Sequence, residues 1–151
     1  MSLKWTCSAF SQLTTGELYT ILQARQAVFV VEQHCPFPEI DGLDPQCRHL
    51  QGRNNDTLVA YCRIVPPGVK FAVPSIGRVL TTAEGRGHGY GIALMEQAVR
   101  ITAELYPGMD MLVAAQTYLE KFYNRFEFYR TGNNYLEDDI PHIDMLRKYL
   151  G

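Results

Sequence analysis

The chain has 151 residues, 46% of them hydrophobic and 20% charged, with a net charge of −2, which predicts a single soluble domain over residues 1–151. The near-neutral charge gives no support to a nucleic-acid partner, and no apolar run approaches the roughly 20 residues of a membrane span. The N-terminus lacks the apolar core of a signal peptide, so we expect a cytoplasmic protein with no membrane partner.

The first third of the chain predicts a strand, a long helix and a loop. Residues 4–13 fit a first strand. Thr14 and Glu17 form a capping-box pattern that begins a helix over 14–33, with apolar residues on one broad face. Residues 35–46 contain three prolines, one glycine and three carboxylates, and therefore predict a loop.

The rest of the chain alternates strands and helices. Strand-like segments cover residues 47–53, 57–65, 75–82 and 109–116. Helical spacing follows residue 91 until Pro107 and Gly108, and a second amphipathic helix covers 118–126. The tail predicts one or two further strands. This order indicates an α/β domain with a mixed sheet, without the strict βαβ alternation of a dinucleotide-binding fold.

Two cysteines and two histidines raise the question of a metal site. His34 precedes Cys35, and Cys47 lies two residues before His49. Such a set can bind zinc, but ligands this close are poorly placed for tetrahedral coordination and the usual Cys-x2–4-Cys spacing is missing. We therefore predict no metal, and expect the cysteines to be reduced and buried as small apolar residues.

A glycine-rich stretch, GRGHGYG over residues 85–91, joins the strand 75–82 to the following helix. Helix N-termini present unpaired N–H groups and a partial positive charge, and glycines let an anion approach them. The sequence matches neither GxxxxGK[ST] nor GxGxxG, which leaves the register R-x-x-G-x-G from Arg86 to Gly91. A strand–helix turn without a ligand is the alternative.

This register resembles the acyl-CoA pyrophosphate loop of the GNAT superfamily of N-acetyltransferases, whose pattern is Q/R-x-x-G-x-G/A. The family places the loop between a strand and a long helix, and follows it with a strand and an "FYxxxGF" segment, here FYNRFEF at 122–128. Residues 24–44 and 135–145 resemble the ElaA-like branch. The resemblance covers about residues 3–149, and implies the GNAT fold with a mostly antiparallel sheet, splayed at the cofactor slot, and helices on both faces.

The resemblance also implies acetyl-CoA as the acyl donor. Backbone groups of Val79 and Leu80 would contact the pantetheine arm, and Gln116 would line the V-shaped slot. The backbone amides that would hold the pyrophosphate are those of Arg86, Gly87, His88, Gly89, Tyr90 and Gly91. Gly85 would only end the preceding turn, so we expect alanine to be tolerated there and valine at Gly89 to abolish cofactor binding.

Acetyl transfer to an amine needs a donor to the thioester oxygen, an acid for the leaving thiolate and a base for the amine. The resemblance implies Tyr123 as the acid and the Leu80 N–H as the donor to the oxygen, although Tyr123 also fits a core position. For the base, Glu32, His49 and His142 are candidates, each with a structural role as the alternative, and a water chain could replace them.

The acidic loop suggests how an amine could be recognised. Asp41 and His49, with Glu32, are candidate substrate-binding residues, while a solvated loop is the alternative. Arg25 could pair with one of the loop carboxylates. Two residues depart from the resemblance: Glu127 and Asp139 stand where the family pattern has glycine, and both could alter the acceptor site.

The expected function is therefore acetyl-CoA-dependent acetylation of a primary amine, on a small molecule or a peptide. One alternative is a GNAT domain that binds acyl-CoA and senses it without catalysis. Another is an autoinducer-synthase-like acyltransferase, which the compact chain and near-neutral charge do not favour. Family members are often dimers, so a homodimer is a possible assembly.

Overall fold

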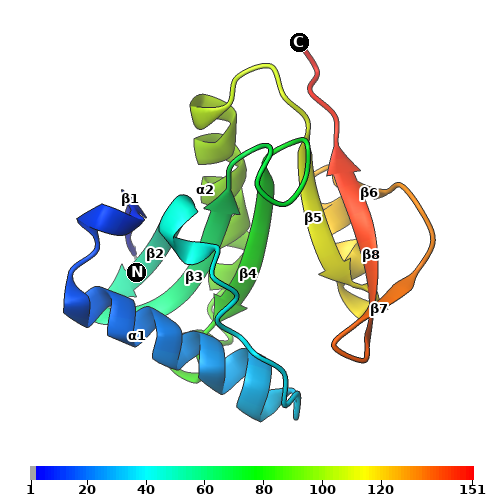
Figure 1. The fold of residues 1–151 in the computed structure, drawn as a ribbon. Helices are drawn as coiled ribbons and strands as arrows, with labels where there is room; N and C mark the ends of the chain where they lie inside the picture. The colour runs from blue at the N-terminus through cyan, green and yellow to red at the C-terminus, as the bar shows by residue number, and fades with distance from the viewer. Residues whose placement is uncertain (1–2) are drawn as a thin grey trace.

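A mixed sheet runs through the computed structural model, which describes residues 3–151 (Figure 1). The strand order is β1-β2-β3-β4-β5-β8-β6, with β7 paired to β8, and only the β4–β5 contact is parallel. The strands are β1 (Lys4–Ala9), β2 (Arg48–Asn54), β3 (Thr57–Val65), β4 (Ser75–Thr81), β5 (Met111–Gln116), β6 (Tyr129–Arg130), β7 (Tyr135–Glu137) and β8 (Ile140–Arg147). This confirms the predicted mixed, mostly antiparallel sheet.

Three helices connect these strands. Helix α1 (Thr15–Arg25) continues as a π-helical segment, Gln26–Glu32, and α2 (Tyr90–Leu105) and α3 (Glu120–Asn124) follow the glycine-rich loop and β5. The predicted capping box is present: the Glu17 N–H donates to Thr14 Oγ1 at 3.0 Å, and the Thr14 N–H donates to Glu17 Oε1 at 2.8 Å.

The helices cover opposite faces of the sheet (Figure 1). On the α1 face, Ile21 packs in a cluster with Tyr61 and Leu80. On the other face, Leu94 and Met95 of α2 join a larger cluster that also includes residues of α3, β3, β5 and β8. Each fully buried apolar side chain of this kind contributes about 1.5–3 kcal/mol, so the two clusters hold the helices against the sheet.

The sheet is open between β4 and β5. Only Ser75 and Leu112 are paired across these two strands, and beyond them the strands diverge (Figure 1). The pairing of β3 with β4 also shifts register between Tyr61 and Arg63, and Arg78 in β4 has a left-handed φ of 51°. A bulge at this position bends β4 away from β5. The slot expected from the sequence is therefore present.

Several predicted boundaries needed correction. The first strand ends at Ala9, because a 3-10 turn occupies residues 10–12, and the expected helix over 118–126 is divided between a 3-10 turn and the five-residue α3. The tail forms three strands rather than one or two, because a tight turn folds β7 back on β8.

The two departures from the family pattern both occupy the conformation that glycine favours. Glu127 has a φ of 66° just after α3, and Asp139 has a φ of 63° in the β7–β8 turn. A residue with a Cβ pays roughly 1 kcal/mol or more in this region, and Asp tolerates it better than Glu. The chain thus keeps the turn geometry at both positions despite the side chains.

Gly85 has a tighter environment than the sequence suggested. A Cβ at this position would lie 2.6 Å from the Val59 carbonyl oxygen and 2.9 Å from Val59 Cβ, both in the buried strand β3. The expectation that alanine is tolerated is therefore wrong.

Gly85→Ala should lower the free energy of unfolding by roughly 1–3 kcal/mol, because it overpacks a rigid site. Urea unfolding measures this, with Gly132→Ala, which has open space around it, as the neutral control.

No helix within residues 3–151 combines the length and apolarity needed to cross a membrane.

Candidate functional site

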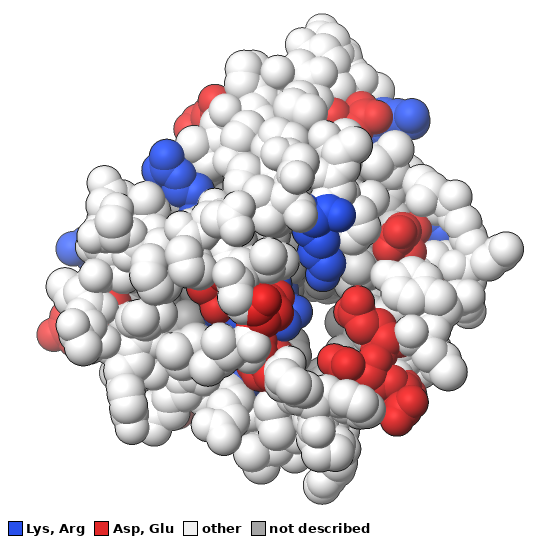
Figure 2. Space-filling model, in the orientation of Figure 1, with Lys and Arg blue, Asp and Glu red and all other residues white. Residues whose placement is uncertain are grey.

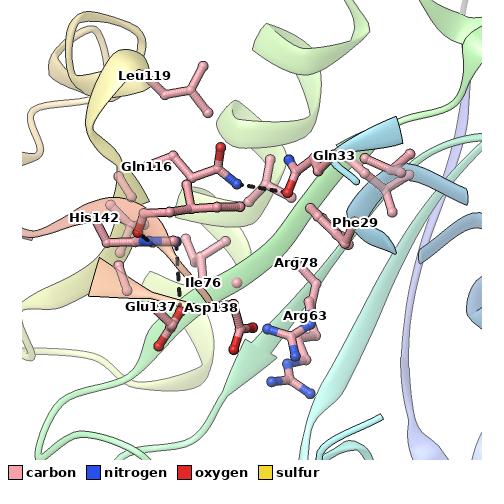
Figure 3. A pocket seen from close by; sticks show the side chains of 18 of the residues that line it. Phe29, Gln33, Arg63, Ile76, Arg78, Gln116, Leu119, Glu137, Asp138 and His142 are labelled. Carbon is pink, nitrogen blue, oxygen red and sulfur yellow. Dashed lines mark hydrogen bonds and ion pairs between the residues drawn. The ribbon is translucent and has the colours of Figure 1, made fainter. Parts of the chain in front are cut away.

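A pocket of about 260 Å³ lies where β4 and β5 separate. Its walls come from the π-helical segment and the loop after it, from β4, from the end of β5 and the turn into α3, and from the β7–β8 hairpin (Figure 3). Segments from most of the chain's length thus meet at one cavity. Val79, Leu80, Arg86, Gln116, Tyr123 and His142 are among the predicted site residues that line it.

The glycine-rich loop presents its backbone amides without partners. Gly87 and Gly89 adopt left-handed φ values of 82° and 75°, and α2 begins at Tyr90. Among the hydrogen bonds of residues 3–151, none uses a backbone N–H of residues 86–91. His88 and Tyr90 stack with ring centroids 5.3 Å apart on this loop. Unpaired amides at the N-terminus of a sixteen-residue helix fit a phosphate anion.

Arg86, in the glycine-rich loop, is already paired with an acidic side chain from another segment. Its guanidinium donates to Glu32 Oε1 at 2.6 Å and to the Thr81 carbonyl oxygen at 3.2 Å. Glu32 does not line the pocket that contains Tyr123 and His142. Glu32 therefore lies beside the glycine-rich loop, and its candidate roles as base and in substrate binding have no support in the structure.

Tyr123 comes from α3 and lines the pocket. The side chain is 6% exposed, and within the described chain no hydrogen bond uses its hydroxyl. Burial raises its pKa, so the phenol is protonated at neutral pH. Phe122 and Phe128 pack edge-on against the ring and fix its orientation. The site thus holds a proton donor with no competing acceptor.

His142 lies in β8 opposite Gln116 of β5. Its Nδ1 is 2.7 Å from the Ile140 carbonyl oxygen, which can only accept, so Nδ1 carries the hydrogen. Tyr135 stacks on the ring with centroids 5.9 Å apart. In the neutral imidazole, Nε2 then carries no hydrogen and can accept one. Figure 3 shows that this nitrogen of the ring faces Glu137.

His49 is a structural residue. It is fully buried and does not line the pocket. The Tyr61 hydroxyl donates to Nδ1 at 2.7 Å, and Nε2 donates to the Asp44 carbonyl oxygen at 2.9 Å. Burial lowers its pKa and outweighs the Asp44 contact. The candidate roles of His49 in proton transfer and substrate binding are wrong, because both ring nitrogens are occupied.

Asp41 is part of an ion network rather than a substrate site. It pairs with Arg63 at 2.5 Å and with Arg78 at 3.5 Å, and it accepts the Leu43 N–H. Burial alone would raise its pKa, but the hydrogen bonds and charge of Arg63 lower it overall. Since Asp41 does not line the pocket, its predicted contact with an amine has no support in the structure.

The same network ties α1 to the sheet. Arg25 pairs with Asp44 at 2.7 Å and with Glu39 at 2.9 Å, as the sequence suggested for one loop carboxylate. Arg63 pairs with Asp44 at 3.0 Å, and Arg78 with Glu39 at 2.5 Å. Arg25 and Arg63 are almost completely buried. Three arginines and three carboxylates thus balance, and they anchor the acidic loop beside the pocket.

Sequence reasoning missed several residues that line the pocket. Gln33 bridges to Gln116, whose amide nitrogen donates to Gln33 Oε1 at 3.2 Å (Figure 3). Glu137 and Asp138 line the pocket from the β7–β8 hairpin. The pairing of Arg63 could have been predicted, because its charge lies within the apolar strand TLVAYCRIV and buried charges are usually paired.

The cysteines of the chain, all within the described residues, form no disulfide in the structure. Cys35, Cys47 and Cys62 are buried and Cys7 is half-buried, and all four are free thiols. Burial raises the pKa of Cys47 to about 11, so it is a neutral thiol. Across residues 3–151, no three side chains of His, Cys, Asp or Glu gather as metal ligands.

Comparison with known proteins agrees with this geometry. A family model for the acetyltransferase (GNAT) domain matches residues 39–149. Protein ElaA of Escherichia coli is 39% identical, with 98% of each chain covered, and a UPF0039 protein of Synechocystis is 39% identical over 97% of this chain and 96% of that protein.

Solved structures give the same result. An acyl-CoA N-acyltransferase from Pseudomonas aeruginosa is 42% identical with a TM-score of 0.92, covering 97% of this chain and 99% of that chain. The crystal structure of Escherichia coli ElaA has a TM-score of 0.90 at 38% identity, with the same coverage. The chain therefore belongs to the GNAT acetyltransferase family and is a close homologue of ElaA and the UPF0039 proteins.

Proposed function

We propose that this protein is an acetyl-CoA-dependent N-acetyltransferase that acetylates a primary amine of a small molecule or peptide by direct attack. The observation that carries the proposal is the combination of an open slot between β4 and β5 with unpartnered amides at one end and a buried tyrosine hydroxyl beside it. A ligand with a phosphate group and a reactive carbonyl fits both parts.

The donor site would use backbone groups more than side chains. The amides of residues 86–91 would hold the pyrophosphate, and the α2 dipole adds to their attraction. Val79 has no partner in β3 and lies on the edge of β4 that no strand covers, so its backbone groups are available to the pantetheine amides. Leu80 pairs with Tyr61, so its backbone groups point toward β3. The role of the Leu80 N–H as donor to the thioester oxygen, expected from the sequence, has no support in the structure, because this N–H faces β3.

The reaction would proceed in one attack. The amine nitrogen forms a bond to the thioester carbonyl carbon, and the carbon–sulfur bond then breaks. Tyr123 gives its phenolic proton to the leaving thiolate, and the amine loses one proton to a base. The phenol's proton is held until transfer because burial raises its pKa.

Two measurements test the proposal. Acetyl-CoA at saturation should raise the melting temperature, since a ligand that binds the native state stabilises it. CoA release should follow when a primary amine is added, from a panel of diamines, amino acids, aminoglycosides and peptide N-termini. Stabilisation without CoA release from any amine would instead support an acyl-CoA sensor, and no stabilisation would contradict the donor site.

Gly89→Val should abolish acetyl-CoA binding. Valine is strained at a φ of 75°, so the loop must change conformation and its amides lose their common direction. Gly108→Val is the matched control, because it has a φ of 80°, open space around it and a position in the turn after α2. Calorimetric titration should show binding for the control only. Equal affinities in the two variants would contradict the role of the loop.

A further inference from the structure

Once the paired charges around the pocket are set aside, one end of the pocket is acidic. The network of Arg25, Arg63 and Arg78 is matched by three carboxylates, and Arg86 is paired with Glu32. Of the remaining charged groups that line the pocket, Glu137 and Asp138 are acidic, and only Lys70, an exposed residue, is basic. Figure 2 shows the hollow in this face with acidic side chains on both sides of it.

A second observation lies beside these carboxylates. The side chain of His142 is 10% exposed, and its only hydrogen bond within residues 3–151 uses Nδ1. Nε2 therefore has no hydrogen-bond partner in the described chain, and His142 lines the pocket, so a ligand can meet this nitrogen. Glu137 Oε2 is 3.7 Å from Nε2, which is too long for a hydrogen bond but close enough to stabilise a positive ring.

We propose that this end of the pocket is an ammonium site, and this rests on the proposed function. Glu137 and Asp138 attract a protonated primary amine, and His142 takes one proton from it through Nε2. The amine nitrogen keeps the electron pair of the broken N–H bond and uses it for the attack. This proton stays on the imidazole, which Glu137 then holds as an ion pair. After the attack the nitrogen loses its second proton to the Tyr123 phenolate, which has given its own proton to the leaving thiolate. His142 is thus a catalytic residue and Glu137 a positioning residue.

The site also favours a class of acceptor. Two carboxylates exceed one ammonium by one negative charge, so an amine with a second positive group balances them better than an amine beside a carboxylate. The acceptor expected is a diamine or polyamine-like cation. Arg63 and Arg78 do not offset this, because both are already neutralised by Glu39, Asp41 and Asp44.

Other titratable groups also face this region. Tyr135 stacks on His142 and donates to Asp144 Oδ1 at 2.7 Å, so that pair is internally satisfied. Further titratable side chains in the pocket lining are Cys35, Glu39, Tyr118 and Tyr123. Glu39 is committed to Arg25 and Arg78, and burial keeps the phenol of Tyr123 protonated. Glu137 is therefore the anion that acts on the ring.

The first experiment compares three amines of equal chain length that differ in the distal charge. With acetyl-CoA saturating, kcat/KM should rank 1,4-diaminobutane above butylamine and butylamine above 4-aminobutanoate. In the double variant E137Q/D138N the ratio between the first and last should fall roughly tenfold or more. D139N is the matched control, because Asp139 lies in the same turn with a φ of 63° but does not line the pocket.

The second experiment measures the proton transfer. H142Q should lower kcat for 1,4-diaminobutane by about 10²-fold while the KM for acetyl-CoA stays the same. E137Q should raise the KM for 1,4-diaminobutane by roughly threefold or more while the KM for acetyl-CoA stays the same, because the anion beside the ammonium is removed. D139N should leave both constants unchanged.

The outcomes separate the two proposals. If no amine releases CoA from the wild-type protein, the proposed function fails. If amines do react but the three are used equally, if 4-aminobutanoate is preferred, or if H142Q retains full kcat, the ammonium site is overturned while the acetyltransferase stands. The ranking together with its loss in E137Q/D138N, but not in D139N, supports the site.

Discussion

Tyr123→Phe should lower kcat by about 10²- to 10³-fold, the usual contribution of a well-placed general acid. Tyr123 lines the pocket, and its hydroxyl has no hydrogen-bond partner in the described chain, so its removal takes away no native hydrogen bond. The free energy of unfolding should therefore change by less than about 0.5 kcal/mol, and the affinity for acetyl-CoA should not change. Steady-state CoA release, urea unfolding and calorimetric titration measure the three quantities.

The control for this substitution is Tyr129→Phe. Tyr129 is an exposed tyrosine in β6 that does not line the pocket, so the same deletion should leave kcat unchanged. If Tyr123→Phe retains full kcat, Tyr123 is a core residue, as its packing against Phe122 and Phe128 would also allow. A large loss of stability would assign the same structural role.

Asp44→Asn should destabilise the protein by about 3–5 kcal/mol, because it removes one partner from a buried ion network. Asp44 accepts from Arg25 at 2.7 Å and from Arg63 at 3.0 Å, and both arginines are almost fully buried. Asparagine keeps the shape but not the charge. Urea unfolding at pH 7 measures the loss, with Asp56→Asn, an exposed residue of the β2–β3 turn, as a control within about 0.5 kcal/mol.

The contribution of Asp44 should depend on pH. Burial acts to raise its pKa, but the hydrogen bonds and charges of Arg25 and Arg63 outweigh burial and hold the folded-state pKa below the ordinary value of 3.8. A lowered folded pKa stabilises the native state above the unfolded value, and this stabilisation is lost as the pH falls through 3.8 toward the folded pKa. The gap in stability between wild type and Asp44→Asn should therefore narrow below about pH 4. A constant gap down to pH 2 would contradict the ion pairing.

Local patterns predicted those features that depend on neighbours in the sequence. The capping box of α1, the loop over 35–46 and the glycine-rich start of α2 each rest on a few adjacent residues, and the structure has all three. The register R-x-x-G-x-G also identified the family, because the backbone amides at a helix N-terminus come from adjacent residues in the sequence. The roles of individual site residues remain proposals.

The acceptor side could not be read in the same way, because it is assembled from distant segments. Whether an acidic loop residue meets an arginine or a substrate depends on which strand lies beside it, and Asp41 lies beside Arg63, 22 residues away. His49 had the right chemistry for a base, but Tyr61 of the next strand occupies its Nδ1. Glu137 acquires its place only when the β7–β8 turn folds.

The separation of β4 from β5 has a consequence for the protein without its ligand. Beyond Ser75, one margin of β4 has no neighbouring strand, although it belongs to the middle of the sheet. Such an unpaired edge is a template for strand addition, and sheet proteins usually shield it. Here an amide-containing ligand arm would supply the missing hydrogen bonds. Bound acetyl-CoA would thus cover this edge of β4 as a neighbouring strand does. A higher concentration of acetyl-CoA should therefore limit self-association through the edge as well as support turnover.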